Sequence, residues 1–76
     1  MSQDPDYLVA IFPSITQVMS SERLLLERRI EHKLVPTPKR VSSECGVSIR
    51  FLPADREAFV QALSGRATIV DIRPMP

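Results

Sequence analysis

Seven prolines divide this chain of 76 residues into short segments, and they constrain its fold more than any other feature of the sequence. A proline inside a helix removes a backbone hydrogen bond and clashes with the preceding turn. Seven prolines against two glycines therefore predict abrupt turns and exclude a bundle of long helices. A chain of this length buries one hydrophobic core, which predicts a single domain.

The composition is that of an ordinary globular protein, with 43% hydrophobic and 25% charged residues. We expect residues 1–6 to be a flexible leader, residues 7–73 to form the domain and residues 74–76 to be a tail. The longest apolar run, Tyr7 to Pro13, has about seven residues, whereas a membrane-spanning helix needs roughly 20. The acidic beginning of the chain also lacks the basic region of a signal peptide. These features predict a cytoplasmic protein with no membrane partner.

The charge balance argues against nucleic acid as a partner. Ten Lys and Arg residues against nine Asp and Glu residues leave a net charge of +1. A surface that neutralises a series of phosphates usually has a stronger basic excess. The chain has no Trp and one Tyr, so it offers few rings on which single-stranded bases could stack.

Hydrophobic periodicity predicts six secondary-structure elements. Strands are expected over residues 7–12, 31–35, 47–51 and 67–72, and helices over residues 15–29 and 53–64. Ser14 is placed as the N-cap of the first helix, with Gln17 completing a capping box, and Gly65 is placed as the cap after the second helix. The order β-α-β-β-α-β predicts an α+β fold of the ferredoxin-like, split βαβ type. We expect a four-stranded antiparallel sheet in the order 4-1-3-2, with both helices on one face.

Each expected helix has an apolar stripe that should face the sheet. The stripes are Ile15, Val18, Met19, Leu25, Leu26 and Ile30 in the first helix, and Ala58, Phe59, Ala62 and Leu63 in the second. Glu22 also lies on the first stripe, and packing alone does not explain a carboxylate at that position.

The chain has a single cysteine, Cys45, and a single histidine, His32. One cysteine can form neither an internal disulfide nor a dithiol redox pair. One cysteine and one histidine do not complete a zinc site of the Cys/His type, so we expect no metal and no cofactor. Three roles remain for Cys45: a buried core residue, a nucleophile or an acceptor of sulfur.

The neighbours of Cys45 are typical of a loop at the start of a strand rather than of a core strand. Cys45 follows Ser42 and Ser43 and stands between Glu44 and Gly46. Gly46 permits unusual backbone angles and would leave the sulfur open to a large partner. This position predicts a thiol that other proteins can reach.

Charged residues close in sequence could affect the ionisation of this thiol. Lys39, Arg40 and Arg50 could stabilise a thiolate on Cys45, whereas Glu44 would oppose it. The sequence alone leaves the balance between them open.

A cysteine hydrolase needs a base beside its nucleophile. His32 stands at the second expected strand, away from the loop of Cys45, so we expect it at the surface rather than in catalysis. A carrier needs one nucleophilic thiolate and no second cysteine that would expel its cargo as a disulfide. The chain therefore fits a carrier better than a true enzyme.

The segment Pro36-Thr37-Pro38 has two interpretations. Its prolines could make a rigid exit from the second strand, or the segment could be a polyproline-type element that binds a partner. The hydroxyls of Thr37, Ser42 and Ser43 could bind an anion or a thiolate, and they could equally cap turns.

Three motifs together resemble the selenium/sulfur carrier-like family, a family of small bacterial domains. They are Phe12-Pro13-Ser14, Leu34-Val35-Pro36-Thr37-Pro38 and Ser42-Ser43-Glu44-Cys45-Gly46-Val47. The resemblance extends over roughly residues 7 to 72. It implies that Cys45 carries sulfur or selenium, with Gly46 as its partner in the Cys-Gly pair.

On this interpretation Cys45 holds a persulfide or selenopersulfide and relays it. The expected donor is a cysteine desulfurase-type enzyme, and the expected acceptor is a small sulfur-carrier or other acceptor protein. Lys39, Arg40 and Arg50 would favour the thiolate, Gly46 would give clearance, and Pro36 and Pro38 would keep the loop stiff.

Two other functions remain open from the residues alone. Split βαβ domains also act as protein-interaction or small-ligand-binding modules through the open sheet face, and they can form homodimers by pairing sheet edges. Cys45 would then only pack. A redox sensor that forms a covalent dimer through Cys45 is the third alternative.

Overall fold

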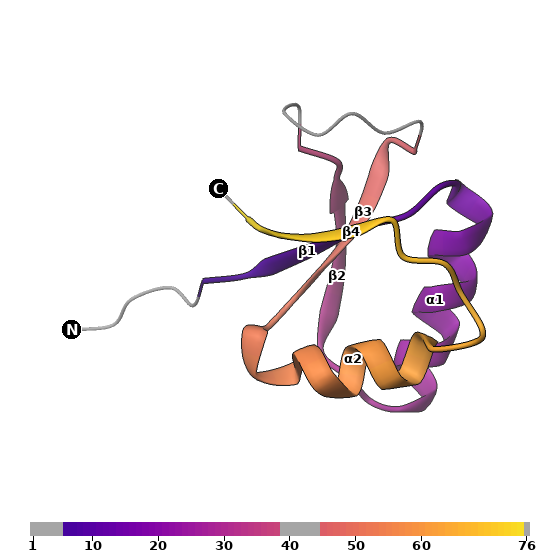
Figure 1. The fold of residues 1–76 in the computed structure, drawn as a ribbon, viewed down its shortest axis with the longest axis vertical. Helices are drawn as coiled ribbons and strands as arrows, with labels where there is room; N and C mark the ends of the chain where they lie inside the picture. Colours follow the sequence, from indigo (N-terminus) through magenta and orange to yellow (C-terminus); the bar gives the residue numbers. More distant parts are fainter. Residues whose placement is uncertain (1–5, 39–44, 76) are drawn as a thin grey trace.

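The computed structural model describes residues 6–38 and 45–75. The strands are β1 (Leu8–Ile11), β2 (His32–Pro36), β3 (Val47–Phe51) and β4 (Asp71–Pro74), and the helices are α1 (Ile15–Glu27) and α2 (Arg56–Leu63) (Figure 1). A short 3-10 helix, η1 (Pro53–Asp55), leads into α2. The three strand pairings are antiparallel and give the order β2-β3-β1-β4, which is 4-1-3-2 when read from β4. The expected α+β fold with a four-stranded antiparallel sheet and two helices is confirmed.

The central strand β1 separates two apolar layers. Its Ala10 lies opposite Ile49 and Ile72 and points toward the helices, whereas its Val9 and Ile11 point to the other face. Side chains of both helices pack into the same cluster as Ala10, so both helices cover one face of the sheet. The buried members of this cluster are Ala10, Phe12, Val18, Leu25, Cys45, Ile49, Phe51, Phe59, Ala62 and Leu63.

Helix α1 begins at the predicted N-cap, but the predicted capping box is wrong, because the Gln17 side chain bonds to Thr68 and not to the Ser14 N–H. Ser14 has an extended backbone, and its Oγ accepts a hydrogen bond from the Gln17 N–H at 3.4 Å. Gln17 Oε1 accepts from the Thr68 N–H at 2.9 Å, so this side chain ties α1 to the segment before β4. The first turn of α1 therefore also helps to fix a distant part of the chain.

Helix α1 ends at Glu27 rather than at the expected Arg29. The Arg29 N–H donates to the Leu26 carbonyl at 3.1 Å, and the Ile30 N–H donates to the Leu25 carbonyl at 3.0 Å. These two bonds form a Schellman motif, which places Arg29 in the left-handed region with φ of 56°. The usual sequence signal for such an end is a glycine, and here the position is occupied by an arginine.

The inward stripes differ in part from those expected. Val18 and Leu25 are buried, but Ile15, Met19 and Leu26 are 52%, 53% and 63% exposed. The arc of α1 that faces the core passes through Ser21, whose buried hydroxyl has no hydrogen-bond partner among the described residues. In α2, Ala58 is exposed, whereas Phe59, Ala62 and Leu63 are buried as expected.

The last strand is also displaced from its expected position. Gly65 has φ of 75° and caps α2 as predicted, and the N–H groups of Arg66 and Ala67 both donate to the Leu63 carbonyl. The chain then returns from the helix layer to the sheet, and the Val70 N–H reaches the Ile11 carbonyl at 2.7 Å. Most of the β-branched run that suggested a strand over residues 67–72 is used for this return, so β4 begins only at residue 71.

Candidate functional site

Cys45 lies immediately before β3, on the side of the sheet that the helices cover. It is 4% exposed and belongs to the main core cluster. Its Sγ donates a hydrogen bond to the Val47 carbonyl at 3.2 Å, an interaction that a thiolate would lose. The expectation of an open thiol is therefore wrong for this structure, because the sulfur is closed off from solvent.

Thr37 holds two successive backbone carbonyls, those of Cys45 and Gly46. Its hydroxyl donates to the Cys45 carbonyl at 2.7 Å, and its N–H donates to the Gly46 carbonyl at 3.0 Å. From the sequence, the Thr37 hydroxyl is a candidate donor to a thiolate or an anion. The structure places its hydroxyl on the backbone of the candidate residue instead.

The prolines that flank Thr37 leave its N–H as the donor available to the Gly46 carbonyl. Pro36 is the last residue of β2 and lies opposite Val47 in β3, so the segment continues the sheet. Because proline has no N–H, Thr37 carries the one backbone donor in the run Pro36-Thr37-Pro38. This N–H donates its hydrogen bond to the Gly46 carbonyl. These contacts support the interpretation of a rigid strand exit.

Gly46 contributes space rather than an unusual backbone angle. Of the two glycines, Gly65 has a positive φ and Gly46 does not. A Cβ built on Gly46 would meet no described atom within 4 Å beyond its chain neighbours. The exposed backbone of Gly46 therefore leaves room beside Cys45 that a larger side chain would occupy.

Three cations are expected near Cys45, and of these Arg50 lies among the described residues. Lys39, Arg40, Ser42 and Ser43 lie outside the described residues. Arg50 is paired with Val9 on the sheet face opposite the helices, and its guanidinium lies 3.9 Å from the centroid of the Tyr7 ring. Its expected role as a thiolate-stabilising cation is wrong, because the strand alternation directs it to the other face.

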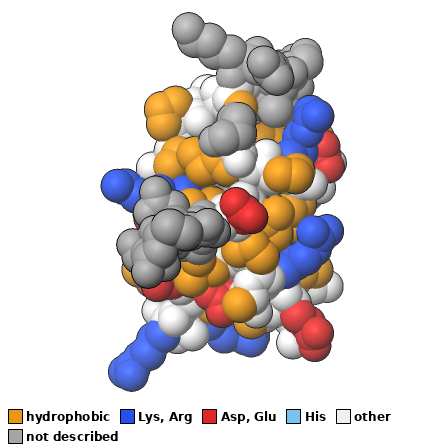
Figure 2. All heavy atoms as spheres, turned by 90° about the vertical axis from the view of Figure 1, so that its left-hand side faces the viewer, with side chains coloured by type: hydrophobic (Ala, Val, Ile, Leu, Met, Phe, Trp, Pro, Cys, Tyr) orange, Lys and Arg blue, Asp and Glu red, His pale blue; other side chains and the backbone are white. Residues whose placement is uncertain are grey.

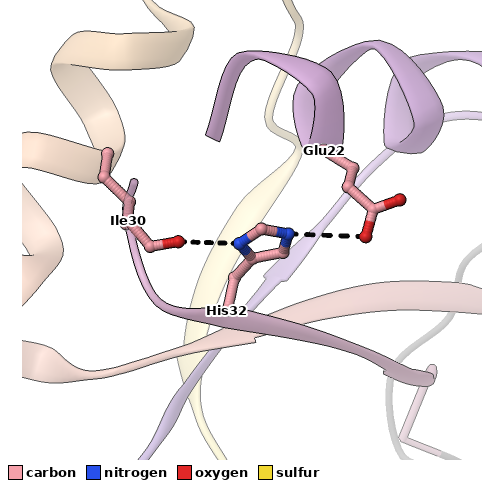
Figure 3. Close-up of polar contacts among 3 residues, drawn as sticks. All are labelled: Glu22, Ile30 and His32. Carbon is pink, nitrogen blue, oxygen red and sulfur yellow. Dashed lines mark hydrogen bonds and ion pairs between the residues drawn. The ribbon is translucent and has the colours of Figure 1, made fainter. Parts of the chain in front are cut away.

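The side chain of His32 is buried, and the expectation that it lies at the surface is wrong. Its side chain is 5% exposed, and both ring nitrogens have partners (Figure 3). Nδ1 lies 2.8 Å from the Ile30 carbonyl, which can only accept, and Nε2 lies 3.4 Å from Glu22 Oε2. The contact between His32 and Glu22 explains why a carboxylate stands on the inner stripe of α1. Sequence reasoning missed it because its partners are in different elements.

His32 is nevertheless separated from Cys45, as the sequence predicts. His32 lies opposite Phe51 at one end of the β2–β3 pair, whereas Cys45 precedes Val47 at the other end. Four residues of strand correspond to about 13 Å. His32 therefore does not serve as the base for the Cys45 thiol in this arrangement.

The helix-free face has a row of cations across the sheet. The register places Lys33 opposite Arg50, Arg50 opposite Val9, and Val9 opposite Arg73. Figure 2 shows the side of the molecule that faces left in Figure 1, where hydrophobic side chains gather in the middle with Lys and Arg toward the margin. Arg73 lies 3.9 Å from Asp71, and both side chains are about half exposed.

Other features of the described residues are less informative. A shallow hollow of about 690 Å³ lies along the outer side of α1, where its lining includes Met19, Leu26 and Arg66. Within residues 6–38 and 45–75, no three His, Cys, Asp or Glu residues are grouped so that they could hold a metal ion. No helix in the same ranges has the length and apolar character needed to cross a membrane.

Comparison with known proteins relates most of the chain to one family. A family model described as "Putative Se/S carrier protein-like" matches residues 7–71, which include the Thr37 and Cys45–Gly46 segments. Comparison with curated proteins found no significant match, and comparison with solved structures found none either. Because the family model covers well over half of the chain, this protein belongs to the Se/S carrier protein-like family.

Proposed function

We propose that this protein carries sulfur or selenium on Cys45. The observation that supports this most strongly is the family match over residues 7–71, which spans the single cysteine of the chain. A lone cysteine suits a carrier, because no second thiol in the same chain can release the cargo by forming a disulfide. The space beside Gly46 adds support from geometry.

The proposed transfer is a thiol–persulfide exchange. The Cys45 thiolate attacks the outer sulfur of a persulfide on the donor, and a new S–S bond forms to Cys45. The S–S bond of the donor breaks, and its inner sulfur leaves as a thiolate, so no oxidant or reductant is consumed. A selenium atom in the outer position would move by the same exchange. An acceptor thiol then takes the outer atom from Cys45 in the same way.

The closed thiol sets a condition on this transfer. To react, Cys45 must give up its bond to the Val47 carbonyl and become accessible from its position of 4% exposure. A partner approaching beside Gly46 would meet little steric resistance from that residue. The proposal therefore includes a local opening around residues 45 and 46.

The partners and the location belong to the proposal as well. The donor that fits this chemistry is a cysteine desulfurase-type enzyme, and the acceptor is a small protein with its own reactive thiol. A reducing cytoplasm would keep a lone thiol free for the exchange.

Mass spectrometry of the intact protein tests the loading step. After incubation with a cysteine desulfurase and cysteine, the protein should gain about 32 Da, the mass of one sulfur atom. Cys45→Ala should gain nothing under the same conditions. An unmodified wild-type protein, or equal loading of Cys45→Ala, would argue against the proposal.

The burial of Cys45 favours a second candidate, a binding module in which Cys45 only packs. The row of Lys33, Arg50 and Arg73 would then suit an acidic segment of a partner protein. Thiol labelling separates the two functions. If Cys45 reacts only through global unfolding, the packing role is favoured. A local route to the thiol favours the carrier.

A further inference from the structure

The hydroxyl of Thr37 belongs to a short chain of hydrogen bonds that has a single direction. Thr37 Oγ1 lies 2.7 Å from the Cys45 carbonyl and 2.8 Å from Ser48 Oγ. A carbonyl only accepts, so the one hydroxyl hydrogen of Thr37 goes to Cys45. Ser48 must then donate to Thr37. The order is therefore Ser48 to Thr37 to the Cys45 carbonyl.

The burial of Ser48 makes this direction stable. Ser48 is 0% exposed and lies within β3, on the sheet face opposite the helices. A buried hydroxyl that loses its partner is costly, so Ser48 holds the Thr37 hydroxyl in the orientation that bonds to Cys45. Together with the bond from the Thr37 N–H to the Gly46 carbonyl, these contacts form what we term the Thr37 clamp.

We propose that the Thr37 clamp controls access to the Cys45 sulfur, with Thr37 as a positioning residue and Ser48 as its support. This inference rests on the proposed carrier function for its biological meaning. Sulfur exchange requires a partner to reach a sulfur that is now 4% exposed. Opening residues 45 and 46 while β3 stays paired from Val47 onward breaks the two bonds that Thr37 donates.

Three substitutions separate the clamp from general packing. Thr37→Val keeps the shape of the side chain but removes the hydroxyl, so the population of the open state should rise about tenfold. Thr37→Ser restores the hydroxyl and should label within about threefold of the wild-type rate. Ser48→Ala removes only the supporting donor, and its labelling rate should lie between those of the wild type and Thr37→Val.

The test is labelling of Cys45 by an aromatic disulfide reagent in the folded protein, at several low urea concentrations. Local opening exposes little surface, so the faster labelling of Thr37→Val should depend only weakly on urea. Val18→Ala is the matched control, because it removes buried side-chain volume from the core but none of the hydrogen bonds of the clamp. It should speed labelling only through global unfolding, with a steep dependence on urea.

Two results would overturn the inference. One is a Thr37→Val protein that labels at the wild-type rate. The other is a Thr37→Val protein whose labelling has the same steep urea dependence as Val18→Ala. If Thr37→Val does not fold, Ser48→Ala gives the same decision.

The labelling experiment needs no sulfur donor, so it is independent of the carrier proposal. If Cys45 never accepts sulfur but Thr37→Val still opens locally, the carrier proposal fails and the clamp remains. If Thr37→Val accepts sulfur on Cys45 at the wild-type rate and its thiol labelling shows no local opening, the clamp inference fails and the carrier proposal remains.

Discussion

At the scale of single residues, the proposed carrier function requires a thiol that is protected between transfers and exposed during them. Cys45 meets the first requirement through burial and its bond to Val47. Under this proposal the second requirement falls on its neighbours: Gly46 offers space, and the two bonds that Thr37 donates would have to open. The two requirements are therefore divided among adjacent residues of the same strand junction.

Gly46→Ala separates clearance from stability. A methyl group at this position meets no described atom within 4 Å, so the free energy of unfolding should change by less than about 1 kcal/mol. Transfer of sulfur from a donor protein should slow, because the methyl group occupies the approach to Cys45. The measurements are urea denaturation and the rate of mass gain. Unchanged transfer would show that Gly46 does not provide clearance.

His32→Leu tests the structural role of the buried histidine. The change leaves the Ile30 carbonyl without its donor, and the free energy of unfolding should fall by about 1–3 kcal/mol. The Glu22 side chain is 27% exposed, so its contact with His32 adds little to this loss. Urea denaturation measures the effect, with Glu22→Gln as the milder control. If the folded variant loaded sulfur more slowly on Cys45, His32 would have a role in the chemistry after all.

At the scale of elements, hydrophobic periodicity predicts which helices and strands form, and in what order, better than it predicts the residues at which they begin and end. An apolar run predicts the strand over residues 7–12, and alternation of apolar and polar residues predicts the strand over residues 47–51. The observed β1 is one residue shorter at each end than expected, and β3 has the expected ends. The end of α1 depends on hydrogen bonds from Arg29 and Ile30, which no glycine announces. The start of β4 depends on the distance that the chain must cover between layers, which no local pattern encodes.

Arg29→Gly should stabilise the protein by releasing the left-handed backbone of this residue. A non-glycine residue at φ of 56° carries a steric cost that glycine avoids, so the free energy of unfolding should rise by about 0.5–1 kcal/mol. Arg29→Ala is the matched control, because it removes the charge but keeps the Cβ. Thermal or urea denaturation compares the three proteins. Equal gains in both variants would assign the effect to charge instead of backbone conformation.

At the scale of the whole molecule, one sheet separates two faces that differ in composition. The helix side holds the main core cluster with Cys45, and the other side holds a smaller buried cluster and the row of Lys33, Arg50 and Arg73. The fold class could be predicted from the sequence because each segment has its own period and the prolines separate the segments. The burial of Cys45 could not, because Cys45 shares its cluster with side chains of α1 and α2, which come from distant parts of the chain.

Lys33→Glu probes the charged side of the sheet. Lys33 lies directly opposite Arg50, and like charges in that position destabilise a strand pair. Replacing Lys33 with an acid should raise the free energy of unfolding by about 0.2–1 kcal/mol at low ionic strength. The gain should shrink at about 1 M salt, where charges are screened. A gain that is independent of salt would mean that the charge pair is not its cause.

The account depends most on Cys45 being able both to accept a sulfur atom and to pass it on. The direct measurement is a single handover: the protein is first loaded to a mass about 32 Da above that of the free chain, purified, and mixed with an acceptor protein that carries a thiol. We predict that the added mass leaves the peptide containing Cys45 and appears on the acceptor. Retention of the sulfur on Cys45 in the presence of the acceptor, or its location on any other residue, would contradict the account.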